Sequence, residues 1–510
     1  MKKPTTTTVN FILVYSLLNI LIFNLPIYKY SLNNLELFSP MGILVLFSIT
    51  VALFAISASL FFIISIFLPK KLIKGFFIFT AICNSIALYF VNTYNVILDK
   101  NMMGNVLNTN SSEALSYYDI NIIFYILILG ILPSIIIFKI NIEKPKRLRI
   151  FTFAITILIS AIGILYINST TWLWFDKHAK ILGGLAMPWS YTINTIRYKQ
   201  KEINSNQIRM NLPDAKFINN EEKIVVLIIG ESARSANFSL YGYGQKTNPK
   251  LQNQNIKVLQ NSQSTTTYTT ASIHSMLSHK GSTSDSFEVL PNYLERQGVD
   301  VVWRANNWGQ PKLNISNIQS ATELRKYCKS DDCKYDGILL TDLKEKIESL
   351  KNNKKFVVLH TAGSHGPTYY KKYPKSFEHF KPVCKSVDVS SCTEEELINA
   401  YDNTILYTDK VINSTIEILK QIKIPSMMIY ISDHGESLGE FGLYLHGTPY
   451  SIAPDFQKDI PFLIWKSTNF KKEIKEQNSY GQNNIFHTIM NALDLRSSIY
   501  NEKLNILKDK

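Results

Sequence analysis

A long apolar region near the N-terminus constrains this 510-residue chain more than any other feature. Residues 11–168 are dominated by Ile, Leu, Phe and Val, whereas the chain from about residue 200 onward has the mixed composition of a globular domain. A helix needs about 20 apolar residues to cross a bilayer. The apolar region therefore predicts five transmembrane helices, at residues 10–27, 41–68, 72–92, 120–140 and 149–168.

The distribution of basic residues predicts the orientation of these spans. The N-terminus carries Lys2 and Lys3, while the loops after the first and third spans, residues 28–40 and 93–119, hold one lysine each. The turns after the second and fourth spans are rich in basic residues: Lys70, Lys71, Lys74, Lys139, Lys144, Lys146, Arg147 and Arg149. Because basic loops stay in the cytoplasm, we expect a cytoplasmic N-terminus and a C-terminal half on the outer face.

The net charge of +14 bears on the partners of the chain. No nucleic-acid-binding module is recognisable, so nucleic acid is not expected as a partner. The charge is interpreted either as attraction to anionic lipid head groups or as a solvated lysine-rich surface.

The cysteines indicate the compartment of the C-terminal half. Cys83 lies in an apolar segment, whereas the other four form two close pairs, Cys328 with Cys333 and Cys384 with Cys392. Such pairs suggest local disulfides or a metal site, although neither lies beside a histidine with zinc-finger spacing. Disulfides form in an oxidising compartment, which agrees with the orientation predicted from the basic loops.

Aromatic residues mark the segment between the two halves: Trp172, Trp174, Phe175, Trp189, Tyr191 and Tyr198. They are typical of a segment that lies at the membrane interface, and a linker with packed aromatics is the alternative. We therefore predict a transmembrane domain at residues 1–170, an interfacial bridging segment at residues 171–215 and a soluble domain at residues 216–510.

Short apolar runs in the soluble half predict buried parallel strands. Helical patterns lie between them, for example at Leu397–Leu419. The alternation of strands and helices favours an α/β sandwich with a mostly parallel central sheet. The runs are Ile224–Ile229, Val299–Trp303, Phe356–Leu359 and Met427–Ile431.

Each of these runs ends in polar or metal-binding residues. Ligands bind beyond the carboxyl ends of the strands in such sheets, so these residues are expected to converge on one edge. In chain order they are Gly230-Glu231-Ser232, then Arg304, Asn306 and Asn307, then His360 and Gly363-Ser364-His365-Gly366-Pro367, and finally Ser432-Asp433-His434-Gly435-Glu436.

Three of the residues at these strand ends suit a zinc ion. Glu231, Asp433 and His434 offer carboxylate and imidazole ligands, and Gly435 permits the turn that two adjacent ligands need. The run Ser264–Thr270 precedes an expected helix start at Ala271–Met276 and offers a hydroxyl. A helix N-terminus can hold a phosphoryl oxygen, and zinc would activate such a hydroxyl as a nucleophile.

The chain resembles a known family. Its motifs look like those of the bacterial phosphoethanolamine transferases, the lipid A-modifying group that includes the mobile colistin-resistance enzymes. The resemblance spans the whole chain and implies the fold of alkaline phosphatases and sulfatases. The motifs are Gly230-Glu231-Ser232-Ala233-Arg234, Thr269-Thr270-Ala271-Ser272-Ile273-His274-Ser275-Met276, Gly363-Ser364-His365-Gly366-Pro367 and Ser432-Asp433-His434-Gly435-Glu436-Ser437.

The resemblance also implies roles for individual residues. Thr269 is the implied nucleophile, with Thr270 as its competitor. The implied zinc ligands are Glu231, Thr269, Asp433 and His434. The implied substrate-side residues are Asn307, which contacts the phosphoethanolamine group, His365 and His446, which can also hold a second zinc, and the acidic Glu436. The implied disulfides are Cys328–Cys333 and Cys384–Cys392, whereas the family's cysteines around the nucleophile loop are absent here.

The function that the resemblance implies is transfer of phosphoethanolamine from phosphatidylethanolamine to an envelope acceptor, with lipid A phosphate as the default. A covalent phosphoethanolamine–threonine is the implied intermediate, and a monomer in the bacterial inner membrane with a periplasmic catalytic domain is expected. The alternatives are a phosphoglycerol transferase of the same fold, and transfer to a core sugar or a periplasmic protein. A non-enzymatic membrane receptor is disfavoured by the convergent strand ends, and a formylglycine sulfatase by the absence of its Cys/Ser-x-Pro-x-Arg signature.

Overall fold

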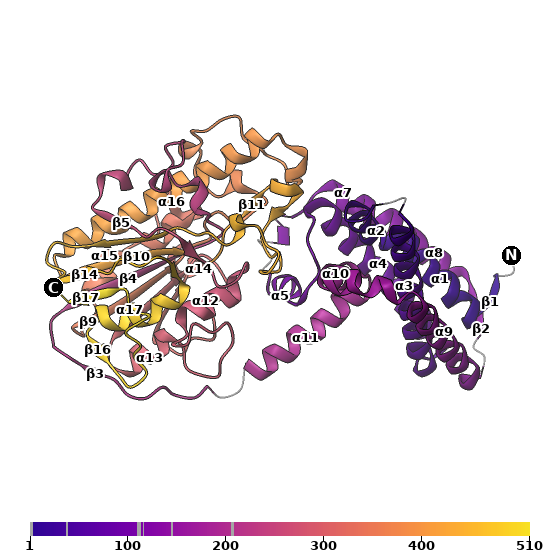
Figure 1. Ribbon diagram of the computed structural model, residues 1–510. Coiled ribbons are helices and arrows are strands. Elements are labelled where there is room, and N and C mark those ends of the chain that lie inside the picture. The colour runs from indigo at the N-terminus through magenta and orange to yellow at the C-terminus, as the bar shows by residue number, and fades with distance from the viewer. Residues whose placement is uncertain are drawn as a thin grey trace. The chain divides into compact units, whose positions relative to one another are not determined.

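The computed structural model describes residues 4–36, 39–109, 114–115, 117–143, 146–205 and 209–509. It divides into two compact units, one made of Met1–Val106 with Tyr118–Lys199 and the other of Leu107–Tyr117 with Gln200–Lys510. Figure 1 shows helices alone in most of the first unit and a large sheet in the second. Three of the basic residues that predict the orientation, Lys2, Lys3 and Lys144, lie outside the described residues.

The first unit is built from helices. They are α1 (Thr8–Phe23), α2 (Leu25–Asn33), α3 (Pro40–Phe67), α4 (Lys70–Tyr94), α5 (Lys100–Asn108), α7 (Ile120–Tyr125), η1 (Ile126–Ile131), α8 (Leu132–Lys139), α9 (Arg147–Ile167), η2 (Ser169–Thr171), α10 (Trp172–Leu185) and α11 (Trp189–Ser205). Two short strands, β1 (Thr5–Thr7) and β2 (Asn141–Glu143), pair in parallel. The N-terminus and the segment after α8, both expected to be cytoplasmic, therefore lie side by side.

Four helical segments of the described chain are long and apolar enough to cross a membrane: Pro40–Phe67, Lys70–Tyr94, Ile120–Lys139 and Arg147–Ile167. They correspond to the last four predicted spans. The first predicted span is a bent pair instead, because α1 and α2 meet at an angle of 50° at Asn24. Pro26 is at the start of α2, where a proline is tolerated because the first helical N–H groups have no partner within the helix.

A network of asparagine side chains ties the first unit together. Asn19 and Asn24 both donate to the carbonyl of Met187, at 2.8 and 3.1 Å, and the Met187 N–H donates to Asn24 Oδ1 at 3.0 Å. Asn84 donates to Asn19 Oδ1 at 2.8 Å and accepts from the Tyr191 hydroxyl at 3.0 Å. The segment between α10 and α11 is thus anchored to α1 and α4 by groups that satisfy one another.

The second unit contains a seven-stranded sheet in the order β5-β13-β10-β4-β9-β7-β8. Its strands are β4 (Lys223–Gly230), β5 (Ile256–Val258), β7 (Asp300–Ala305), β8 (Asn317–Ser320), β9 (Lys354–His360), β10 (Ser426–Ser432) and β13 (Phe462–Lys466). The four predicted runs lie in β4, β7, β9 and β10, except that Val299 precedes β7. All the pairings among β10, β4, β9, β7 and β8 are parallel. The pairings of β13 with β10 and β5 are antiparallel. The α/β fold with a mostly parallel sheet is therefore confirmed.

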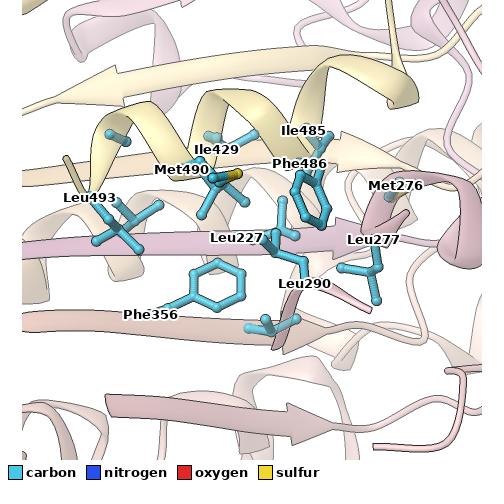
Figure 2. Close-up of a cluster of buried hydrophobic side chains, with 14 of the residues drawn as sticks. Leu227, Met276, Leu277, Leu290, Phe356, Ile429, Ile485, Phe486, Met490 and Leu493 are labelled. Carbon is cyan, nitrogen blue, oxygen red and sulfur yellow. The ribbon is translucent and has the colours of Figure 1, made fainter. Parts of the chain in front are cut away.

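Helices cover both faces of this sheet (Figure 1). On one face α12 (Thr269–Leu277), α13 (Leu290–Arg296) and α17 (Ile485–Ala492) pack on β4, β9 and β10 in one apolar core, in which Figure 2 labels Leu227, Phe356 and Ile429. On the other face lies α16 (Glu394–Ile422), which contains the predicted helix 397–419. Because β4, β9 and β10 are buried along their whole length, their ends are held at fixed positions.

The remaining elements of the second unit are short. They include β3 (Lys216–Phe217), β6 (Ser262–Gln263), α14 (Ala321–Leu324), η6 (Asp331–Lys334), η7 (Asp336–Leu340), α15 (Leu343–Glu348), β11 (Ser437–Leu438), η11 (Glu440–Gly442), β12 (Tyr444–Leu445), β14 (Lys472–Ile474), β15 (Tyr480–Gly481), β16 (Leu495–Arg496) and β17 (Leu507–Asp509). The unit also contains the disulfides Cys328–Cys333 and Cys384–Cys392, and Cys83 of the first unit is a free thiol.

Candidate metal centre and active site

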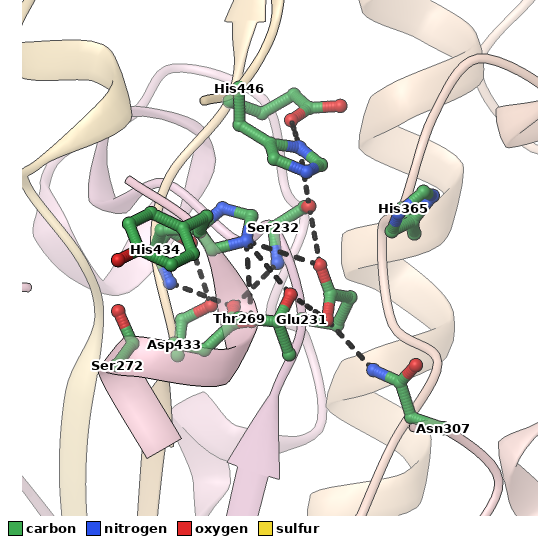
Figure 3. Close-up of polar contacts among 12 residues, drawn as sticks. Glu231, Ser232, Thr269, Ser272, Asn307, His365, Asp433, His434 and His446 are labelled. Carbon is green, nitrogen blue, oxygen red and sulfur yellow. Dashed lines mark hydrogen bonds and ion pairs between the residues drawn. The ribbon is translucent and has the colours of Figure 1, made fainter. Parts of the chain in front are cut away.

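The carboxyl ends of the central strands bring polar side chains to one place (Figure 3). Gly230 of β4 pairs with Ser432 of β10, and Ile229 pairs with His360 of β9. The residues that directly follow β4 and β10 therefore emerge beside each other. As the sequence predicts, the polar groups that follow several strands share one edge of the sheet.

Glu231, Asp433 and His434 form a compact buried group. His434 Nε2 lies 3.4 Å from Glu231 Oε1 and 3.2 Å from Asp433 Oδ2. One ligand atom from each of the three residues can be chosen so that all lie within 4.8 Å of one another. The side chains of all three are no more than 1% exposed, so little water reaches the group.

The chemistry of this group fits a divalent cation. Burial and the neighbouring Glu231 carboxylate raise the pKa of Asp433 well above its usual range. Asp433 Oδ2 is buried and has no hydrogen-bond partner among the described residues. Two buried carboxylates that face each other repel unless a positive charge lies between them. Carboxylate, imidazole and hydroxyl ligands together suit zinc.

The turn after β4 orients both carboxylates. Ser232 has a φ of +53°, and its N–H donates to Asp433 Oδ1 at 3.1 Å. Its hydroxyl donates to Glu231 Oε1 at 2.9 Å. Only one oxygen of each carboxylate is engaged by these two bonds. Ser232 lies in one of the sequence motifs, but the sequence predicts no role for it, because serine is common after strands.

Thr269 is the first residue of α12 and lies against this group. Its Oγ1 is 3.2 Å from Glu231 Oε2 and 3.3 Å from His434 Nε2. Thr269 is buried, whereas Thr270 is half-buried. The structure thus brings together the whole predicted ligand set of Glu231, Thr269, Asp433 and His434. Figure 3 shows Thr269 between Glu231 and Asp433.

A loop after β7 covers Thr269. Gly309 has a φ of +97°, and a Cβ at this position would lie 3.1 Å from Thr269 Cγ2. Two residues earlier, the Asn307 side-chain amide donates to Glu231 Oε2 at 2.7 Å and to the Thr361 carbonyl at 3.0 Å. Asn307, implied to contact the phosphoethanolamine group, therefore contacts a predicted metal ligand in this structure.

The predicted substrate-side histidines lie next to the metal group. The ring of His446 is centred 4.1 Å from that of His434 and 5.2 Å from that of His365. Burial and His434 lower the pKa of His446, whose Nδ1 lies 2.8 Å from Glu436 Oε2. Glu231, His365 and His446 also form a group whose ligand atoms lie within 4.8 Å of one another, so these three residues could hold a cation beside the first group.

Glu436 and Arg234 support the hairpin that carries His446. Glu436 Oε1 accepts a hydrogen bond from the Tyr369 hydroxyl at 2.6 Å. The Arg234 guanidinium contacts Glu440 at 2.5 Å, inside the turn between β11 and β12. The hairpin formed by β11 and β12 leads directly into His446, so these contacts fix its position.

Comparison with known proteins follows the division of the chain. The sulfatase family model matches residues 223–495, and the model for phosphoethanolamine transferase EptA/EptB matches residues 56–203. The sheet-bearing unit is thus a sulfatase-type domain. Phosphoethanolamine transferase EptA of Helicobacter pylori is 38% identical over 512 residues, which cover 98% of this chain and 96% of the relative. The chain belongs to the EptA family of phosphoethanolamine transferases.

Solved structures agree with this assignment. The integral membrane protein lipooligosaccharide phosphoethanolamine transferase A from Neisseria meningitidis is similar with a TM-score of 0.90 and 27% identity, covering 99% of both chains. The C-terminal periplasmic domain of phosphoethanolamine transferase EptC from Campylobacter jejuni has a TM-score of 0.52 and 36% identity, covering 58% of this chain and 96% of that domain.

Proposed function

We propose that this enzyme transfers phosphoethanolamine from phosphatidylethanolamine to lipid A phosphate through a covalent phosphoethanolamine–threonine at Thr269. The position of the Thr269 hydroxyl carries the proposal, because it lies at a helix start and within 3.3 Å of Glu231 and His434. Similarity to EptA over nearly the whole chain supports the transferred group. The lipooligosaccharide named for the Neisseria relative supports a lipid A-type acceptor.

The proposed cofactor is Zn²⁺, held by Glu231, Thr269, Asp433 and His434. Zinc at this position would lower the pKa of the Thr269 hydroxyl and offset the charge of the phosphoryl group. The group of Glu231, His365 and His446 is the candidate site for a second ion.

Separate residues of the chain have separate roles in the proposed reaction. Thr269 Oγ would attack the phosphorus, the bond from phosphorus to the diacylglycerol oxygen would break, and diacylglycerol would leave with a proton. His446 Nδ1 lies 2.8 Å from Glu436 Oε2, so Nε2 would carry this proton from Thr269 to the leaving oxygen when it holds no second ion. A P–OH oxygen of the acceptor phosphate would then attack the same phosphorus, the bond from phosphorus to Thr269 Oγ would break, and Thr269 would take up the acceptor's proton. The first backbone N–H groups of α12 would hold the phosphoryl oxygens in both steps.

The location of the reaction is proposed from the spans and the loop charges. Residues 1–170 form the proposed transmembrane domain with a cytoplasmic N-terminus, and residues 171–215 bridge at the interface. The catalytic domain, residues 216–510, lies in the periplasm, where the disulfides Cys328–Cys333 and Cys384–Cys392 are stable. The inner membrane supplies the lipid donor, and the protein acts as a monomer.

Mass spectrometry of the intact protein tests the proposal. The zinc-loaded full-length chain incubated with phosphatidylethanolamine should gain the mass of one phosphoethanolamine group. Thr269→Ala should abolish the adduct, while Thr270→Ala, the matched neighbour, should retain it. An adduct that survives Thr269→Ala would overturn the nucleophile, and an adduct formed only with phosphatidylglycerol would favour a phosphoglycerol transferase.

The acceptor needs a separate experiment. Lipid A extracted from cells with and without the gene should differ by a phosphoethanolamine on a lipid A phosphate. Unchanged lipid A beside a modified core sugar or periplasmic protein would assign the enzyme to one of the other acceptors.

A further inference from the structure

Asp336 is a buried carboxylate outside the metal group that links two loops of the active site. Its Oδ1 accepts a hydrogen bond from Asn306 Nδ2 at 2.9 Å and from the Ala362 N–H at 2.8 Å. Its Oδ2 accepts from the Gly363 N–H at 2.8 Å. Asp336 is 6% exposed, and burial raises its pKa although these hydrogen bonds oppose the rise.

Both loops contact Glu231. The first continues from Asn306 to Asn307, whose amide donates to Glu231 Oε2 at 2.7 Å. In the second, Gly363 has a φ of +45° and approaches so closely that a Cβ there would lie 2.6 Å from the Glu231 carbonyl oxygen. The next N–H, of Ser364, donates to that carbonyl at 2.9 Å. The second loop then continues to His365.

Hydrogen bonds from neighbouring elements restrain the segment that carries Asp336. It is the first residue of η7, and Arg304 Nη1 donates to the carbonyls at the other end of that helix, Leu339 at 2.8 Å and Thr341 at 2.6 Å. The Gly337 N–H donates to the Tyr407 hydroxyl at 3.1 Å. Because its segment is restrained, the Asp336 carboxylate stays in place. The loops that donate hydrogen bonds to it are therefore positioned by it.

We propose that Asp336 is a positioning residue that fixes the Asn307 and His365 loops against Glu231. The inference rests on the proposed phosphoethanolamine transfer. Asp336 itself accepts bonds only from Asn306, Ala362 and Gly363 among the described residues, so it acts through the loops rather than on the substrate. Without it, Asn307 and the backbone at Gly363 would no longer restrain Glu231, whose oxygens face both Thr269 and His434.

The test uses the full-length protein in detergent micelles with saturating zinc. Asp336→Asn places an N–H₂ group against one of the N–H donors, and Asn306→Ala removes one of the three bonds without altering a charge. Each variant should lower kcat/KM about tenfold or more and weaken zinc in a chelator competition about tenfold, in the range seen for groups that orient metal ligands. Asp300→Asn is the matched control, because this carboxylate accepts its hydrogen bonds from Asn352 and lies in neither loop.

A double-mutant cycle separates positioning from general loss of structure. In an Asn307→Ala background, Asp336→Asn should cost much less than in the wild type, because the two residues act on the same ligand. An equal fold-decrease in kcat/KM in both backgrounds would overturn the role of Asp336. So would kcat/KM values of Asn306→Ala and Asp336→Asn within twofold of wild type. A wild-type protein that binds zinc but transfers no phosphoethanolamine would overturn the proposed function instead, and the zinc competition would still report on Asp336.

Discussion

The side-chain amide of Asn307 donates a hydrogen bond to Glu231 Oε2 across 2.7 Å. The bond restrains an oxygen that also faces Thr269, so Asn307→Ala should weaken zinc binding about tenfold to 100-fold. Competition with a chromogenic chelator measures this affinity. Asn317→Ala, which removes an amide bonded to Lys346, should leave zinc affinity unchanged. If zinc affinity is unaltered and phosphatidylethanolamine binds more weakly, Asn307 contacts the substrate directly, as the family resemblance implies.

Removal of zinc should destabilise the catalytic domain, because the Glu231 and Asp433 carboxylates would then repel each other in a buried site. Chelation should lower the midpoint of thermal unfolding, and added zinc should restore it. At a free zinc concentration of about 100 times Kd the linkage contributes about 2.7 kcal/mol. Asp433→Ala should show no zinc-dependent change in the midpoint, and a zinc-dependent change of wild-type size in that variant would place the ion elsewhere.

Gly309→Ala should lower kcat/KM by more than its loss of stability accounts for. The new Cβ would lie 3.1 Å from Thr269 Cγ2, so the proposed nucleophile would have to move by a few tenths of an ångström. We expect kcat/KM to fall about tenfold, since small displacements of reacting groups are costly. Gly298→Ala is the control, because its φ of +88° imposes a similar backbone strain but its Cβ would contact nothing within 4 Å. Equal activities of the two variants would contradict the prediction.

Asp402 should make stability depend on pH in a direction unusual for a carboxylate. It accepts hydrogen bonds from Asn237 and Tyr243, and burial raises its pKa to about 6. The folded state therefore binds the proton more tightly than the unfolded state, whose aspartate pKa is about 3.9. The stabilisation from protonated Asp402 is complete below pH 4 and is lost as the pH rises through 6.

A comparison of wild type with Asp402→Asn isolates this contribution. The free energy of unfolding of the variant, relative to that of the wild type, should increase by as much as about 3 kcal/mol between pH 4 and pH 7. Denaturation of the metal-free protein at each pH measures the difference, because zinc release then plays no part. A difference that stays constant across this range would show that Asp402 has the same pKa in both states.

Within the central sheet, the strands that could be predicted from the sequence are buried along all or most of their length. Strands β4, β9 and β10 are buried at every residue, so they read as uninterrupted apolar runs. The edge strands β5 and β8 are short and only partly buried, and no such run marks them. The bend between α1 and α2 was also missed, because an apolar stretch carries no information about its own direction.

The residues of the candidate site also fall into those that could be predicted from the sequence and those that could not. Glu231, Asp433 and His434 follow buried strands directly, so sheet topology alone predicts their convergence. His446 lies beyond the β11–β12 hairpin, and only the family resemblance identified it. Asp336 was not identified at all, because its hydrogen-bond partners lie 26 to 30 residues away along the chain. Contacts of this kind depend on the assembled fold and leave no local pattern.

The asparagine network of the first unit has a consequence for how the protein is made. Helix α1 is synthesised first, yet Asn19 and Asn24 bond to Met187, which follows them by 168 and 163 residues. An amide without a partner is costly in hydrocarbon, so α1 reaches its final state only after α4 and the segment before α11 have joined it. Insertion of the first helix is thus provisional until translation has passed Tyr191.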